Sequence, residues 1–152
     1  MADKGDPPPI FALFNEIGII NQLAAALFES RLPPGVLVSH FSVLNHLIRV
    51  RDGATPLQLA NAFQVPKTTM THTLAGLEKR GWVALRPNPR DKRSKQVWLT
   101  DAGRAFRDGA IQSLAPDMQR IAGDLPGLAD DLLPGLARLR AYMDKARAGD
   151  DE

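Results

Sequence analysis

The stretch 55–99 restricts the fold of this chain more than any other part of the sequence. It opens with a helix signal, because Thr55 can cap a helix, a proline suits the first turn, and a glutamine three residues on can reach back to the cap. This helix ends before Pro66, since the residue preceding a proline is disfavoured in the α region. A second helix then runs from about Pro66 to Arg80, where Gly81 can supply the left-handed residue that ends it. The pattern predicts two helices joined by a tight turn.

The second of these helices has two different faces. Met70, Leu74 and Leu77 recur at helical spacing and form a stripe that must lie on a core. The opposite face carries short hydrogen-bonding side chains, which can approach the edges of DNA bases closely. A merely solvated face is the alternative, although such a face more often carries Glu, Lys and Gln. The residues of this helix that we predict to contact DNA are Lys67, Thr68, Thr69, Thr71 and His72, with Ala75 beside them.

Positive charge is concentrated on a two-strand ribbon that follows this helix. Two β-favouring runs, 82–85 and 96–99, are separated by ten residues with two prolines and five cations. Residues 79–95 hold seven cations and one acid, a net charge of +6, whereas the whole chain carries only +2. This concentration is typical of a phosphate-binding surface, and a merely solvated loop would not explain it. The contacts predicted from the ribbon tip are Arg90, Asp91, Lys92, Arg93 and Lys95.

This order of elements resembles the winged helix-turn-helix of the MarR (multiple-antibiotic-resistance regulator) family. The similarity is carried by LEKRG at 77–81, by DKR at 91–93, and by Leu-Thr with a later glycine at 99–103. The resemblance implies that Arg93 enters the minor groove of DNA and that Asp91 steadies its guanidinium. A narrow minor groove does attract an inserted cation, and a carboxylate can hold a guanidinium fork. The chain departs from the family pattern at Pro66, where a serine-type cap is usual, and at His72, where an arginine is common.

The two ends of the chain predict a dimer. A helix from Ile10 to about Glu29 is apolar on more than one side, so it needs two burial partners, and a second subunit can be one of them. Residues 31–35 break the chain, and a helix over 36–50 follows. We expect its inward residues to be Phe41, Leu44, Leu47 and Ile48.

Two further helical regions follow the ribbon. Thr100 should cap a helix that Pro116 kinks without ending. Its expected inward residues are Phe106, Ala110, Ile111 and Leu114. After a turn at 123–127, a last helix carries a leucine-rich face, with Pro134 as a candidate break or kink. The predicted fold is mostly α with a small two-strand β-wing. Its predicted regions are an N-terminal arm and dimerisation helix at 1–34, a winged helix-turn-helix at 35–100, and C-terminal helices at 101–152 that complete the dimerisation region.

Composition removes several other classes of function. The chain has no cysteine, which excludes disulfides, thiol redox sensing and cysteine–zinc sites. No metal site or cofactor is expected, because the histidines lack a metal-binding spacing. His40 and His46 are interpreted as ordinary half-buried residues, with a role in lining an effector cavity as the alternative. No glycine-rich phosphate loop or nucleophile elbow is present, so an enzyme is not expected. Without a signal peptide or an apolar run expected to cross a bilayer, the predicted location is cytoplasmic, with no membrane partner.

These patterns together predict a sequence-specific transcriptional regulator, most simply a repressor. A two-fold homodimer presents two recognition helices, so it would bind a pseudo-palindromic double-stranded DNA operator. The resemblance further implies release by a small aromatic or acidic effector that enters near the junction of the dimerisation and DNA-binding parts. The alternative is a winged-helix protein-interaction module without DNA-binding function, which would present an apolar or acidic recognition face.

Overall fold

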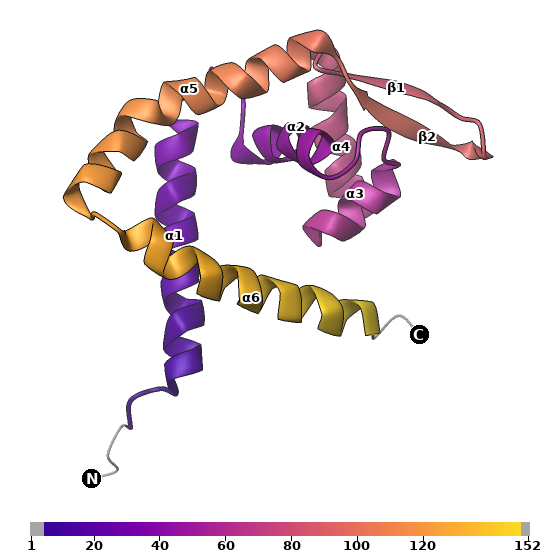
Figure 1. The fold of residues 1–152 in the computed structure, drawn as a ribbon. Helices are drawn as coiled ribbons and strands as arrows, with labels where there is room; N and C mark the ends of the chain where they lie inside the picture. Colours follow the sequence, from indigo (N-terminus) through magenta and orange to yellow (C-terminus); the bar gives the residue numbers. More distant parts are fainter. Residues whose placement is uncertain (1–4, 150–152) are drawn as a thin grey trace. The chain divides into compact units, whose positions relative to one another are not determined.

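The computed structural model describes residues 5–149 and divides the chain into two units, which meet between Ser113 and Leu114. The first unit holds α1 (Pro9–Glu29), α2 (Val38–Arg49), α3 (Pro56–Phe63), α4 (Lys67–Lys79), β1 (Val83–Asn88), β2 (Asp91–Leu99) and the first half of α5 (Asp101–Asp124) (Figure 1). The second unit holds the rest of α5 and α6 (Leu128–Gly149). The prediction of a mostly helical chain with one small two-stranded sheet is confirmed.

The core of the first unit lies between α2, α3, α4 and the ribbon. Leu44, Leu59, Leu77 and Val97, one from each of these elements, have no exposed surface. Burying a leucine-sized side chain contributes about 1.5–3 kcal/mol, so these residues hold the three helices and the ribbon together as one body. The stripe predicted on α4 is confirmed, because Met70 and Leu74 are also buried in this core.

The helix ends around the α3–α4 turn follow the sequence signals. Thr55 Oγ1 accepts a hydrogen bond from the Gln58 amide at 3.2 Å, and Gln58 Oε1 accepts one from the Thr55 amide at 3.0 Å. This reciprocal capping box confirms the predicted start of α3. Gln64 ends α3 with a left-handed φ of 53°, and α4 begins after Pro66 without a side-chain cap. Gly81, with φ 75°, follows the end of α4 as predicted.

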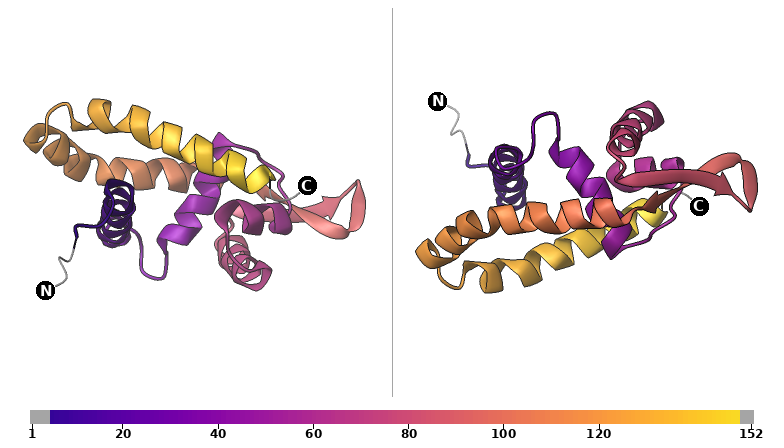
Figure 2. Two further views of the ribbon diagram at one scale, coloured as in Figure 1. Left: turned by 90° about the horizontal axis from the view of Figure 1, so that it is seen from below. Right: turned by 90° about the horizontal axis from the view of Figure 1, so that it is seen from above.

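The ribbon is longer than the sequence suggested. We expected two four-residue strands around a ten-residue loop, but β1 and β2 pair antiparallel up to Pro87 opposite Lys95, and a bulge then precedes the pair Asn88–Asp91. Charged side chains do not prevent pairing, because the hydrogen bonds of the ribbon form between backbone groups. A proline is tolerated because each strand of a two-stranded ribbon has an open edge, where no N–H is needed. In both views of Figure 2 the ribbon extends beyond α2, α3 and α4. Of the basic residues of the ribbon, Arg86, Lys92, Arg93 and Lys95 therefore lie on strands, and Arg90 lies in the turn.

Helix α1 exposes apolar side chains on most of its surface. Only Phe28 is buried, where its ring meets that of Phe41 edge-on at 4.4 Å. The exposed apolar side chains are Ile10, Phe11, Leu13, Phe14, Ile19, Ile20 and Leu23. The helix has the length and a mean hydropathy, 1.5, that could also suit a membrane span. The expectation that no apolar run approaches such a length is thus wrong on length and composition, although a helix buried between protein subunits passes the same test.

The two C-terminal helices run through their prolines. Pro116 lies inside α5, as predicted, and Pro134 lies inside an unbroken α6. Helix α5 continues to Asp124, so the turn predicted at 123–127 is shorter and is completed by Gly127 with a left-handed φ of 77°. Ala110 is buried as expected, but Ile111 is 43% exposed in the single chain, because it lies one residue round the helix from the buried stripe.

Candidate nucleic-acid interface

Helix α4 presents the polar face that the sequence predicted. The core holds one side of the helix, with Met70, Thr73, Leu74 and Leu77 buried, and this fixes the opposite side outward. Every side chain predicted to contact DNA from this helix is exposed, namely Lys67, Thr68, Thr69, Thr71 and His72. Ala75 on the same face is exposed as well. These α4 residues therefore lie on the exposed side of the helix, and their contact with DNA stays a prediction.

The hydroxyl group of Thr71 already donates its proton in a hydrogen bond within α4. Thr71 Oγ1 donates to the Lys67 carbonyl oxygen at 2.9 Å, a common back-bond of threonine within a helix. The oxygen therefore presents lone pairs outward, and the methyl group lies beside them. In this rotamer Thr71 suits the amino group of adenine or cytosine, or the methyl group of thymine.

The tip of the ribbon is ordered by short polar side chains. Asn88 Oδ1 accepts from the Arg90 amide at 3.0 Å, and the Asn88 side-chain amide donates to Ser94 Oγ at 3.0 Å. Asp91 Oδ1 accepts from the backbone amide of Arg93 at 3.0 Å, whereas its distance to Arg93 Nε is 3.9 Å. The carboxylate thus holds the backbone that carries Arg93 and touches the guanidinium only at ion-pair range. The guanidinium fork implied by the resemblance is not formed in the protein alone, and the Arg93 side chain is 96% exposed.

A groove joins the two predicted contact regions. It has a volume of about 750 Å³ and lies between the start of α3, the start of α4 and the ribbon. Lys67 and Thr71 line it from α4, and Asp91, Arg93 and Lys95 line it from the ribbon. Five of the ten predicted residues, distant in the sequence, therefore meet in one cationic groove. Thr68 and Thr69 lie outside it on α4, and Arg90 and Lys92 lie near the tip.

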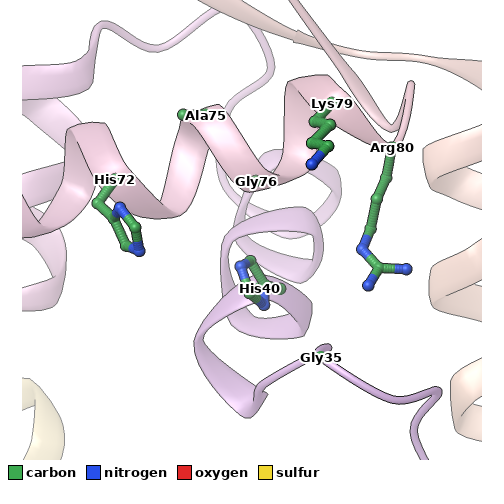
Figure 3. A pocket seen from close by; sticks show the side chains of 7 residues that line it. All are labelled: Gly35, His40, His72, Ala75, Gly76, Lys79 and Arg80. Atoms are coloured by element: carbon green, nitrogen blue, oxygen red, sulfur yellow. The ribbon is translucent and has the colours of Figure 1, made fainter.

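A second cleft, which the sequence did not reveal, lies on the other flank of α4. Its volume is about 520 Å³, and Figure 3 shows the residues that line it. It is lined by Gly35, His40, His72, Ala75, Gly76, Lys79 and Arg80. Of these, only His72 was among the predicted DNA contacts. A sequence signal did exist, because a glycine in the interior of a helix often marks a close approach. A Cβ at Gly76 would lie 3.0 Å from His40 Nε2.

Hydrogen bonding fixes the tautomer of His40. Its Nδ1 accepts from the Leu37 amide at 2.9 Å, so the proton of the neutral ring lies on Nε2, which faces Gly76. Burial, followed by the nearby charges of Arg80 and His72, lowers the pKa of His40. Burial, followed by the charge of Arg49, likewise lowers the pKa of His46, whose ring lies 5.3 Å from that of Phe63.

These shifts predict that the protein loses stability in mild acid. A lowered pKa means that the folded state binds fewer protons than the unfolded state below the ordinary histidine pKa of about 6.5. The contribution of the neutral rings is present above that pH and is lost as the pH falls through the folded-state values. Thermal melts should give a lower midpoint at about pH 5.5 than at about pH 7.5. In the double variant His40→Gln, His46→Gln this difference should shrink, and an equal difference in both proteins would contradict the assignment.

The three helices α2, α3 and α4 with the β1–β2 ribbon form a winged helix-turn-helix, the fold of a large class of DNA-binding proteins. Comparison with known proteins points to the MarR family. Residues 35–94 match the sequence model of the MarR family. The multiple antibiotic resistance protein MarR of Escherichia coli (strain K12) is 33% identical over 116 residues, which cover 71% of this chain and 80% of that protein.

Two further relatives extend the likeness over most of the chain. The HTH-type transcriptional repressor YetL of Bacillus subtilis (strain 168) is 31% identical over 148 residues, 93% of this chain and 87% of that protein. A crystal structure of an E. coli MarR mutant complexed with operator DNA matches with a TM-score of 0.66 at 31% identity, covering 90% of this chain and 94% of that one. This chain belongs to the MarR family of transcriptional regulators.

Proposed function

We propose that this protein is a transcriptional repressor that binds a pseudo-palindromic operator as a homodimer. The observation that carries the proposal is the exposed, threonine-rich face of α4 beside a groove lined by Lys67, Arg93 and Lys95. Threonine side chains can read base edges, and the flanking cations can neutralise phosphates. The family relatives support it, because YetL is a transcriptional repressor and the MarR mutant was crystallised with operator DNA.

The dimer is proposed on the exposed apolar surface of the terminal helices. In a two-fold dimer, residues 1–34 and 101–152 of both subunits form the dimerisation region, and residues 35–100 form each DNA-binding domain. A protein subunit, and not a lipid bilayer, then covers α1, and the protein is a soluble cytoplasmic one. A small aromatic or acidic effector that releases the operator, entering near the junction of these regions, remains part of the proposal.

The alternative function, a protein-interaction module, requires a different recognition surface. An apolar or acidic face on α4 would favour it, whereas the exposed face carries threonines, His72 and Lys67. Catalysis is not proposed, since the family relatives are transcriptional regulators.

Binding of the protein to the DNA upstream of its own gene, measured by fluorescence anisotropy against a random duplex of equal length, tests the function. We expect tighter binding to one upstream site than to the random duplex, by the factor of about 10³ or more that separates specific from non-specific binding. Equal, weak binding to both duplexes would favour the interaction module.

The same assay tests the role of α4. Thr68→Ala or Thr71→Ala should weaken operator binding by roughly 1–3 kcal/mol for each good hydrogen bond to a base that the change removes, while binding to the random duplex hardly changes. Thr73→Ser is the matched control, because Thr73 is buried and its hydroxyl bonds the Thr69 carbonyl at 3.1 Å. If the alanine variants bound both duplexes more weakly by the same factor, these side chains would not be reading bases.

A further inference from the structure

The second cleft, on the flank of α4 away from the ribbon, has the composition of an oxyanion site. Lys79 and Arg80 bring two positive charges, and His40 and His72 bring two imidazoles. Of the described residues that line the cleft, none is acidic, and none is an apolar residue larger than alanine. Figure 3 shows the side chains of His72, Lys79 and Arg80 on the side of α4 where His40 lies.

Two of the donors in this cleft are held in place before any ligand arrives. The His40 ring is held by the bond from the Leu37 amide to Nδ1, which leaves the ring proton on Nε2, the atom that faces Gly76 in the cleft lining. The Arg80 guanidinium is fixed by a bond from Nη2 to the Pro34 carbonyl oxygen at 3.1 Å and lies 5.3 Å from the Trp82 ring. A guanidinium has five N–H groups, so this anchoring bond leaves donors for an anion. Donors that are already oriented lose little entropy on binding.

The composition favours the phosphate of a polymer over a small organic ligand. Sites for small molecules are mostly apolar and enclose most of the ligand surface, whereas this cleft offers donors and no large apolar side chain. The position of the cleft on α4 also favours a DNA phosphate. Lys67, in the groove beside the ribbon, and Gly76, in the cleft, are nine residues apart, so at 100° per residue they lie on opposite flanks of the helix.

We propose that the cleft formed by His40, His72, Lys79 and Arg80 binds a backbone phosphate of the operator, on the strand opposite to the one that the ribbon contacts. The inference rests on the proposed DNA-binding function. A helix in the major groove, which is about 12 Å wide, has a phosphate chain on each flank. With the threonine face toward the bases, the ribbon groove meets one chain and the cleft meets the other. Phosphate contacts on both flanks would fix the rotation of α4 in the groove.

A pair of variants at His40 tests the phosphate contact without removing the cap of α2. Gln and Glu both carry an oxygen that can accept the Leu37 amide, as at the third position of a capping box, and they differ in charge. We expect His40→Gln to bind the operator within about threefold of the wild type and His40→Glu to bind at least about tenfold more weakly, since an anion would face the phosphate. Equal affinity of the two variants, with both folded by circular dichroism, would overturn the proposal.

Lys79→Ala supplies a second, independent readout. In a dimer it should lower the slope of log affinity against log salt by about one to two units, one phosphate contact per subunit, for operator and random DNA alike. Arg49→Ala also removes one positive charge, at the exposed C-terminal end of α2 and outside both the cleft and the predicted DNA contacts, and should leave the slope unchanged. An unchanged slope in Lys79→Ala while the wild type binds its operator would refute the cleft and spare the proposed function. Failure of the wild type to bind DNA would refute both.

Nuclear magnetic resonance separates a DNA phosphate from a free anion. The ring signals of His40 should shift when operator duplex is added and stay in place with millimolar inorganic phosphate at matched ionic strength. A shift with inorganic phosphate that operator DNA does not reproduce would mean that the cleft is a small-anion site, and the proposal would be wrong.

Discussion

Deletion of residues 1–28 should leave an aggregating product and strongly weaken specific operator binding. Most of the apolar side chains of α1 are exposed in the single chain, and so are many on α5 and α6. Without α1, one of the two terminal regions proposed to form the dimer is missing, and the exposed apolar surface of the remaining helices should associate non-specifically. A monomer would also engage only one half-site. Linking two binding units raises apparent affinity by about 10²–10⁴, so the decrease in affinity should be of that order.

A truncated protein can fail for trivial reasons, so a point variant makes the same prediction more sharply. Leu23 is 66% exposed and contributes little to the core of its own subunit. Leu23→Asp should therefore leave the melting temperature of the DNA-binding domain nearly unchanged and shift the dimer toward a monomer in light scattering at micromolar concentration. Operator affinity should fall with it. Gln22→Glu, which adds a negative charge at the preceding exposed position, is the matched control and should remain dimeric.

Light scattering together with sedimentation in the presence of lipid vesicles shows whether a second subunit or a membrane covers α1. A detergent-free dimer that does not sediment with lipid vesicles supports the subunit. A wild-type protein that is monomeric in buffer and sediments with vesicles would show that the length and apolarity of α1 serve a membrane.

Local signals in the sequence predicted the recognition helix well, because the forces that shape it are local. The Thr55–Gln58 capping box, the stripe on α4 and the left-handed Gly81 each depend on residues within a few positions. The length of the ribbon was underestimated from the β-propensity of each segment alone. Pairing depends on the register between β1 and β2, which brings residues of low β-propensity such as Pro87 opposite Lys95.

The cleft at His40 was missed for a related reason. No sequence pattern says that the start of α2 lies against the middle of α4, 36 residues later. Gly76 alone hinted at it. Asp91 also differs from the expectation. The sequence suggested an ion pair with the Arg93 guanidinium, whereas the carboxylate accepts a hydrogen bond from the Arg93 backbone amide at 3.0 Å and lies 3.9 Å from Nε.

Removal of the wing arginine is the second change from which we expect a large effect. If Arg93 enters the minor groove, Arg93→Ala removes one inserted cation per subunit and should cost roughly 1–3 kcal/mol for each. It should also erase any preference for A·T-rich flanks, because the narrow groove of such DNA is what attracts the cation. Lys92→Ala, at the neighbouring position, is the control. It should lower the slope of log affinity against log salt concentration by about one to two units and leave the preference for A·T-rich flanking DNA unchanged. Arg93→Lys keeps the charge but not the planar fork, and should recover affinity more than flank preference.

Two variants of Asp91 then show what this carboxylate does for the arginine. Asp91→Ala removes both the acceptor of the Arg93 amide, at 3.0 Å, and the negative charge 3.9 Å from Nε. Asp91→Asn keeps an oxygen that can accept the amide and removes only the charge. If the backbone bond matters most, the alanine variant should weaken operator binding and the asparagine variant should not, since it also relieves repulsion from phosphate. If the ion pair orients the guanidinium once DNA is bound, both variants should weaken binding and lose A·T preference. Stronger binding by both variants would mean that Asp91 acts only as an unfavourable charge and that Arg93 is not held at all.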